Sequence, residues 1–369
     1  MKNINLVSFH LPMLRLICAT VLVVASADAA RAQEWRLEPI FRAGGEYDDN
    51  ATLNPRTDQE IQLSGLLFDA KADVYYASPR TSFFFEPRIL VRRYDDPAVL
   101  DSEDYFLRSR FRHRAGLNTF GFRVNYDQQP VRNAERLDAD LDVEDSDEIA
   151  NDDTGRVLNV GTRKKWRMSP YWDYQLSSLS TIGANFDYTD TQYDKVPGLL
   201  LVDYSDARLT LNFRRSLSNV TNWGFSLSGR TYDTENLPDE VDTIAAFFNL
   251  SHDLSENTRV DARIGLENQD QANFDTDPEV VGHLRLSRRL DIIRLFAEYR
   301  RSVHGSGSGS LSSRDSVNLN FQRRLSDKIS AGLGVRAYRE TRLGGALAAN
   351  ERNYVQLQSS FTWYLSTAM

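Results

Sequence analysis

Apolar and polar residues alternate with a period of two along nearly the whole chain. In segment 119–128, Phe120, Phe122, Val124 and Tyr126 are separated by Gly121 and by polar residues. The same alternation recurs later in the chain, at 182–188, 208–214, 260–267, 317–322, 329–337 and 355–365. A period of two is typical of β-strands with one apolar and one polar face, and little 3.6-residue periodicity competes with it. The pattern therefore predicts an all-β protein.

The length of the alternating runs separates two all-β architectures. Strands of a β-sandwich, whose apolar face would form a dry core, are usually about 5–6 residues long. A tilted strand that crosses a bilayer needs about 9–11 residues, which is closer to the runs in this chain. We therefore predict a transmembrane antiparallel β-barrel of about sixteen strands, with fourteen or eighteen as alternatives. The predicted strands span 35–47, 61–77, 82–94, 104–115, 119–128, 156–167, 179–190, 205–216, 222–232, 243–253, 258–268, 279–289, 292–303, 315–324, 328–339 and 353–365.

The connections between these runs are of two kinds. Short turns alternate with long polar loops, as expected for the periplasmic and extracellular ends of an outer-membrane barrel. Four short turns share a leucine in similar contexts, RRSLSN, SHDLSEN, SRRLD and QRRLSD. Their spacing repeats at the length of one long hairpin. The barrel hypothesis therefore predicts both chain ends on the periplasmic side.

The N-terminus has the features of a secretory signal peptide. Lys2 and Arg15 precede an apolar stretch, and Ala30-Arg31-Ala32 offers a cleavage site. We expect residues 1–32 to be removed, with Cys18, leaving 33–369 as one barrel domain without cysteine. The chain has a net charge of −8, and the segment 135–153 alone holds ten acids and one arginine. The negative charge is therefore concentrated in one predicted extracellular loop.

The aromatic residues provide an independent test of the barrel. Amphipathic rings collect at the two membrane interfaces. In the predicted topology the five tryptophans, including Trp172, lie near periplasmic ends, and several tyrosines, including Tyr299, lie near extracellular ends. The predicted membrane girdle comprises Trp35, Trp166, Trp223, Trp363, Tyr126 and Tyr188.

Arginine is frequent at positions predicted to face the barrel interior. In FLRSRFRHRAG (106–116), four arginines occupy every second position. An arginine facing lipid near the midplane would cost about 2–4 kcal/mol, so this ladder must face the lumen. Either the lumen has mixed charge, with cross-strand ion pairs that fix register, or it forms a cationic track for an anionic solute or polymer. The candidate solute-binding residues are Arg36, Arg42, Arg88, Arg92, Arg108, Arg110, Arg112, Arg114, Arg123, Arg208, Arg214 and Arg263.

Other chemistries find little support in the sequence. The four histidines after residue 32 are far apart, and no Ser-His-acid or paired-carboxylate site can be assembled, so no catalysis is expected. The acidic segment has Val143 where an EF-hand requires glycine and Ile149 where it requires an acid. We therefore expect no metal site, no cofactor and no nucleic-acid partner.

The end of the first predicted strand carries a short motif, Tyr47-Asp48-Asp49-Asn50. This motif, with the repeated turns, resembles a family of outer-membrane β-barrel proteins associated with bacterial exopolysaccharide biosynthesis and export genes. The resemblance implies a channel in polysaccharide export, with a secreted polysaccharide and periplasmic export components as partners.

The sequence thus predicts a channel in the outer membrane of a Gram-negative bacterium, in contact with lipid and lipopolysaccharide. The leading hypothesis is a passive conduit that exports an anionic exopolysaccharide through an arginine-rich lumen. One alternative is a general or anion-selective porin for small solutes. A second alternative is a structural or adhesive surface barrel whose long loops make the contacts.

Overall fold

The regular elements of the chain are antiparallel β-strands. The computed structural model describes residues 34–48, 63–95, 101–131, 161–194, 201–234, 240–271, 274–275, 278–306, 310–342 and 352–363. Within these residues no helix is long and apolar enough to cross a membrane. The strands are β1 (Glu34–Asp48), β2 (Leu63–Ala77), β3 (Thr81–Tyr94), β4 (Ser102–Ala115), β5 (Asn118–Pro130), β6 (Thr162–Gln175), β7 (Ser180–Tyr193), β8 (Tyr204–Ser216), β9 (Thr221–Thr234), β10 (Val241–Ser255), β11 (Thr258–Gln271), β12 (Phe274–Asp275), β13 (Glu279–Arg289), β14 (Ile293–Ser306), β15 (Ser310–Ser326), β16 (Ile329–Arg342) and β17 (Arg352–Trp363).

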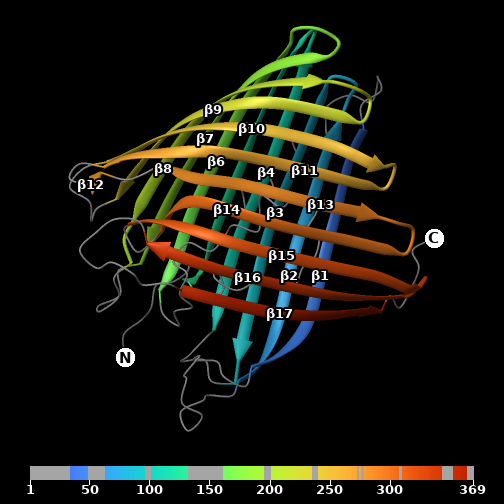
Figure 1. Ribbon diagram of the computed structural model, residues 1–369. Coiled ribbons are helices and arrows are strands. Elements are labelled where there is room, and N and C mark those ends of the chain that lie inside the picture. Colours follow the sequence, from blue (N-terminus) through green and yellow to red (C-terminus); the bar gives the residue numbers. More distant parts are fainter. Residues whose placement is uncertain are drawn as a thin grey trace.

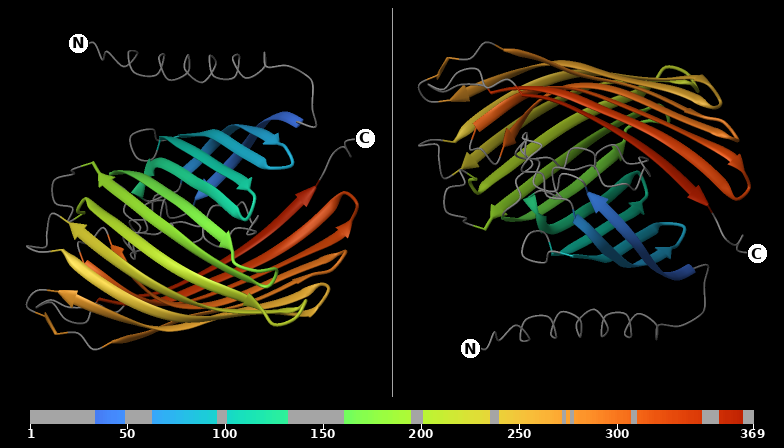
Figure 2. Two further views of the ribbon diagram at one scale, coloured as in Figure 1. Left: turned by 90° about the horizontal axis from the view of Figure 1, so that it is seen from above. Right: turned by 90° about the horizontal axis from the view of Figure 1, so that it is seen from below.

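Sixteen long strands form one meandering sheet in which each strand pairs with the next along the chain. The two-residue β12 pairs with the end of β11, and β11 continues the sheet by pairing with β13. Among the described residues β1 and β17 do not pair, so the sheet is open between its first and last strands. Strands β1–β7 form one wall, and β11–β17 form the facing wall (Figures 1 and 2). The strands of the facing wall run in a direction that crosses that of β1–β7.

Seven connections of two to four residues lie at one edge of the sheet, here called the turn end. Most connections at the opposite edge, the loop end, are longer and lie outside the described residues, although β14 and β15 are joined by residues 307–309 alone. The described turns therefore confirm the short connections that the sequence predicted. The turn-end connections are 78–80, 116–117, 176–179, 217–220, 256–257, 290–292 and 327–328.

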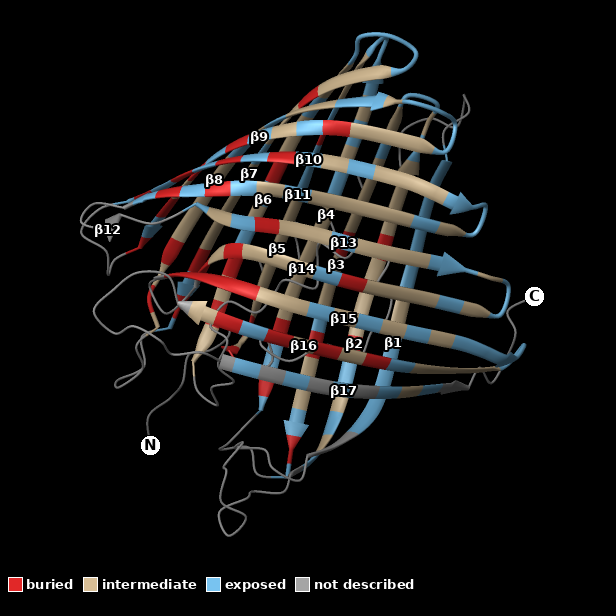
Figure 3. Ribbon diagram, in the orientation of Figure 1, coloured by how far each residue is buried: buried red, intermediate tan, exposed pale blue. Residues whose placement is uncertain are grey.

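The sheet is apolar outside and polar inside. Large apolar side chains on the outer face are exposed, as at Leu66 (74%) and Phe41 (70%), whereas inner-face charged groups are buried, as at Asp104 (0%) and Arg163 (0%). Figure 3 shows the buried, intermediate and exposed positions along the strands. A broad exposed apolar surface would be unfavourable in water but is matched by lipid, where strands must pair laterally to satisfy their backbone groups. The fold is a transmembrane antiparallel β-barrel, as the sequence predicted.

The sixth strand lies further along the chain than predicted, and this changes the position of Trp166. The sixth strand was predicted at 156–167, but β6 spans Thr162–Gln175 and continues through Pro170. Proline has no N–H to donate, and the pairing of β6 with β7 omits Ser169 and Pro170. The ladder resumes on both sides, so the proline interrupts pairing without ending the strand. Trp166 therefore lies near the loop end, and its predicted position at the periplasmic turns was wrong.

The aromatic residues fall into two groups on the outer face. At the turn end, the Trp35 ring lies 4.6 Å from that of Tyr76, and Trp223 lies 5.3 Å from Phe225. Trp172 and the backbone of Trp363 are at the same end, while the Trp363 side chain lies outside the described residues. Toward the loop end, the rings of Tyr126 and Trp166 are 4.6 Å apart, and Tyr188 is in register with Met168, two residues further along β6.

Several sequence predictions fall where the structure gives no description. The signal peptide (1–32), Asp49, Asn50 and the acidic segment 135–153 lie outside the described residues. Tyr47 and Asp48 end β1, and only their backbone is described.

Candidate functional site

Strand register determines which arginines face the interior. On β4, Arg108 is opposite Glu86, Arg110 opposite Phe84 and Arg112 opposite Ser82, all on the inner face of β3. Because successive residues of a strand point to opposite faces, the residues between them face outward. The same alternation places all twelve candidate arginines on the inner face of the sheet.

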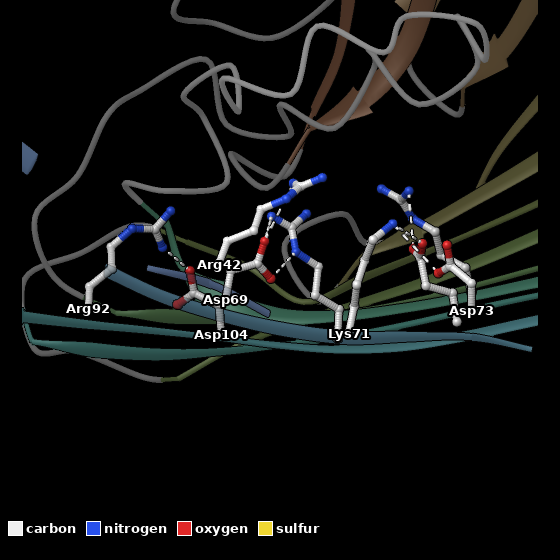
Figure 4. A network of polar contacts seen from close by, with 9 residues as sticks. Arg42, Asp69, Lys71, Asp73, Arg92 and Asp104 are labelled. Atoms are coloured by element: carbon white, nitrogen blue, oxygen red, sulfur yellow. Dashed lines mark hydrogen bonds and ion pairs between the residues drawn. The ribbon is translucent and has the colours of Figure 1, made fainter. Parts of the chain in front are cut away.

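Toward the loop end, the inner face of β1–β4 is a network of ion pairs (Figure 4). The Asp69 carboxylate lies 2.8 Å from Arg88 Nε and 3.7 Å from Arg42 Nη1, and Arg92 pairs with Asp104. These acids are almost completely buried, and each has a cation beside it, which offsets the cost of removing the carboxylate from water. In this network the arginines stabilise the strand register, and the network as a whole carries little net charge because the acids neutralise them.

The middle of the same wall has a second compensated group. Glu86 accepts a hydrogen bond from Lys71 at 2.8 Å and lies 3.5 Å from Arg108, and Lys71 is also 3.6 Å from Asp73. Two cations and two acids therefore balance at this level. Arg108, the first member of the predicted ladder, belongs to this balanced group.

Nearer the turn end, aromatic rings replace the acids. The Arg36 guanidinium lies 4.7 Å from the centre of the Tyr75 ring, Tyr75 lies 4.9 Å from Phe84, and Arg110 lies 5.7 Å from Phe84 on the other side. A guanidinium stacked on a ring keeps its charge and its N–H donors at the edge. Arg36 also forms an ion pair with Glu38 at 3.1 Å. The row thus holds these guanidinium groups in place between aromatic rings.

The last two arginines of β4 are exposed on the inner face. Within the described part of the chain, no carboxylate lies within ion-pair distance of Arg112 or Arg114. Arg112 is flanked in register by Ser82 and Gly121, neither of which can neutralise it. Arg114 adjoins the turn at Gly116, whose φ of 61° is readily adopted by glycine. Positive charge therefore accumulates at the turn end of this wall, where Arg123 lies opposite Arg110.

The remaining strands, from β6 to β15, combine both arrangements. Arg214 pairs with Asp173 at 3.3 Å, and the Arg263 guanidinium lies 3.6 Å from the centre of the Phe247 ring. At the turn end of β10–β15 a cavity of about 1210 Å³ has a lining that includes Arg259, Arg285, Arg289, Arg294, Asp253 and Asp261. Arg259 pairs with Asp261 at 3.1 Å. The lining of this cavity is therefore also basic, but its charge is neutralised more than at the turn end of β4.

A buried cluster occupies the lumen at the loop end. Arg230 on β9 pairs with Asp206 and donates a hydrogen bond of 3.1 Å to the Val303 carbonyl oxygen on β14. Arg208, opposite Arg230 in register, completes the charged part of the cluster. The apolar part, here called the loop-end cluster, brings together both walls at Val131, Tyr193, Tyr204, Tyr232, Val241, Ala245, Phe247, Val281, Val303 and Leu311.

The loop-end cluster was not predicted from the sequence. The sequence signal for this cluster was the inward-facing aromatic residues Tyr204, Tyr232 and Phe247, because buried rings are not expected in a water-filled lumen. The tip of the β14–β15 hairpin is buried on both faces at 311–314, which strand alternation alone cannot predict. The cluster narrows the interior at this end, whereas the arginines of β4 remain exposed at the other.

An apolar exterior around an arginine-lined interior defines a transmembrane β-barrel of the outer-membrane class. No family model matches the chain, and no curated protein matches its sequence.

Among solved structures, the chain is similar to siderophore receptors and to an iron transporter. It matches the siderophore receptor PirA from Acinetobacter baumannii with 9% identity and a TM-score of 0.40, covering 91% of this chain and 60% of the receptor. It matches a mutant of the ferric enterobactin receptor PfeA from Pseudomonas aeruginosa with 9% identity and a TM-score of 0.45, covering 85% and 54%. The FrpB iron transporter from Neisseria meningitidis gives 9% identity and a TM-score of 0.43, covering 91% and 60%. The chain spans less than two thirds of each receptor, and this similarity is too low to assign a ligand or an activity.

Proposed function

We propose that the protein is an outer-membrane conduit through which an anionic polysaccharide leaves the cell. The observation that carries this proposal is the turn end of β4, where Arg112 and Arg114 face the lumen without a carboxylate partner among the described residues. Fixed positive charge on a low-dielectric wall raises the local concentration of anions. Several weak binding sites, one after another along the lumen, favour passage of the polymer over its retention.

The proposal places the turn end in the periplasm, so the exposed arginines are the first charges that an exported polymer meets. The resemblance of Tyr47-Asp48-Asp49-Asn50 to a family associated with exopolysaccharide export supports this direction. In this proposal outer-membrane lipid, lipopolysaccharide and periplasmic export components are partners, whereas catalysis and nucleic-acid binding play no part.

A second candidate function is an anion-selective porin for small solutes. The loop-end cluster favours it, because buried rings such as Tyr232 narrow the lumen, and a small anion needs less space than a polymer. Both functions use the same arginines at the turn end, so the size of the permeant separates them.

Single-channel recording distinguishes these functions. The test compares polygalacturonate with uncharged dextran of equal length, added at the turn end of the reconstituted barrel. We expect polygalacturonate to interrupt the current and dextran to leave it unchanged. Replacing Arg110, Arg112 and Arg114 with glutamine should abolish the interruption and reduce anion selectivity, whereas three lysines should retain both because the charge remains.

Each alternative has its own signature. Current without polymer interruption supports the small-solute porin, and the absence of current supports a structural or adhesive barrel. A deletion strain that exports its polysaccharide at the normal rate would overturn the export proposal.

A further inference from the structure

Three turn-end strand termini carry a pair of adjacent arginines. The pairs are Arg214–Arg215 on β8, Arg288–Arg289 on β13 and Arg323–Arg324 on β15, all within the repeated turn sequences. Because neighbouring residues of a strand face opposite sides, each pair places one arginine in the lumen and one on the lipid-facing surface. The channel proposal concerns arginines that face the lumen and gives no role to the outward members, Arg215, Arg288 and Arg323.

The outward arginines lie where the apolar surface ends. Arg215 is in register with Trp223 and follows Phe213 on the same face. Arg288 is in register with Leu295, and Arg323 with Ile293. All three side chains are exposed, and no carboxylate of the described residues forms an ion pair with any of them. Each is thus a cation at the edge of the apolar belt.

The loop end provides a contrast on the same outer face. Arg93 pairs with Glu103 at 2.5 Å, and Arg301 lies 2.9 Å from Glu279 and 3.4 Å from Asp315. Outward arginines at the loop end therefore have acids supplied by the protein. The arginines at the turn end lack such acids, so their counter-charge must come from their surroundings.

We propose that Arg215, Arg288 and Arg323 bind the phosphate groups of anionic phospholipids in the leaflet at the turn end. A guanidinium donates two parallel hydrogen bonds to phosphate oxygens, and its aliphatic stem packs along apolar surface. A lipid-facing arginine costs far less free energy near the interface than at the bilayer midplane, so a modest headgroup interaction makes the position favourable. Trp223, which is in register with Arg215, supplies an amphipathic ring of the kind that is enriched at membrane interfaces.

Reconstitution into vesicles of defined composition tests this inference. The melting temperature of the barrel is measured in phosphatidylcholine vesicles and in phosphatidylcholine mixed with phosphatidylglycerol. We expect the wild type to melt at a higher temperature in the mixed vesicles. Replacing Arg215, Arg288 and Arg323 with glutamine should remove this increase.

The arginine pairs provide a matched control. Replacing the inward partners Arg214, Arg289 and Arg324 with glutamine removes the same charge from the same turns, yet the increase should persist. Equal loss in both triple variants would overturn the inference, since net charge alone would then explain the effect. An increase of the same size with inorganic phosphate added to the detergent-solubilised protein would also overturn it.

Native mass spectrometry of the wild-type protein provides a second measurement that does not depend on the folding of a variant. Protein released from mixed vesicles should retain phosphatidylglycerol in preference to phosphatidylcholine. Retention of both lipids in their bulk proportion would contradict the inference.

Discussion

Arg112 at the turn end of β4 and Arg230 at the loop end of β9 both face the lumen, yet their surroundings differ completely. Arg112 is exposed between Ser82 and Gly121. Arg230 is 5% exposed, pairs with Asp206 and donates a hydrogen bond to the Val303 carbonyl oxygen on β14. One residue type therefore has two roles, as an accessible cation and as a structural tie across the lumen.

The difference originates on neighbouring strands. The direct register partners of Arg230 are Arg208 and Thr243, and neither offers a negative charge. Its acid, Asp206, is two residues from Arg208 on β8, in the diagonal position that a long side chain reaches. No acid occupies an equivalent position near Arg112 among the described residues, so its charge persists. The role of an inward arginine is decided by diagonal neighbours as much as by opposite ones.

Removing Arg230 should have the largest effect. In Arg230→Gln, Asp206 and Glu267 lose a cation in a buried setting, which typically costs about 3–5 kcal/mol. We expect a large drop in the urea midpoint of the reconstituted barrel. Arg112→Gln is the control and should change stability by less than about 0.5 kcal/mol. Equal midpoints for the two variants would show that the loop-end tie does not stabilise the fold.

We expect the side chains of the loop-end cluster to limit single-channel conductance more strongly than the lumenal charges do. Tyr232 is fully buried, its ring centre is 5.6 Å from that of Tyr204, and it packs against Gly305 on β14. In Tyr232→Ala the ring is lost, with a destabilisation of about 3–5 kcal/mol and an increase in single-channel conductance. Tyr232→Phe keeps the ring and should conduct as the wild type does. A folded Tyr232→Ala barrel with unchanged conductance would exclude this cluster as the narrowest part of the lumen.

Strand alternation was sufficient to predict the barrel class and the inward orientation of Arg108 to Arg114, because a period of two fixes which face each residue takes. It was insufficient for β6, which was predicted to end at residue 167 but continues through Pro170, where only the pairing with β7 is interrupted.

The identity of interaction partners was harder to predict. Asp69 and Arg88 are 19 residues apart and meet only when β2 and β3 pair in one particular register. The contact of Arg230 with Val303 joins β9 to β14, and it depends on how far the β14–β15 hairpin folds inward. Such contacts follow from the curvature of the sheet, which a single-sequence pattern does not encode.

The smallest predicted effect compares two arginines on one strand. Glu86 contacts both Lys71 and Arg108, so Arg108→Gln leaves the acid with Lys71 at 2.8 Å and should cost less than about 1 kcal/mol. Arg112→Gln removes a charge that no described acid offsets, so it should shift the reversal potential in a salt gradient further toward cations than Arg108→Gln does. Equal shifts would mean that the ion pair with Glu86 does not screen Arg108 from the permeant. The distinction between compensated and exposed arginines would then fail within β4 itself, although the two side chains are only four residues apart.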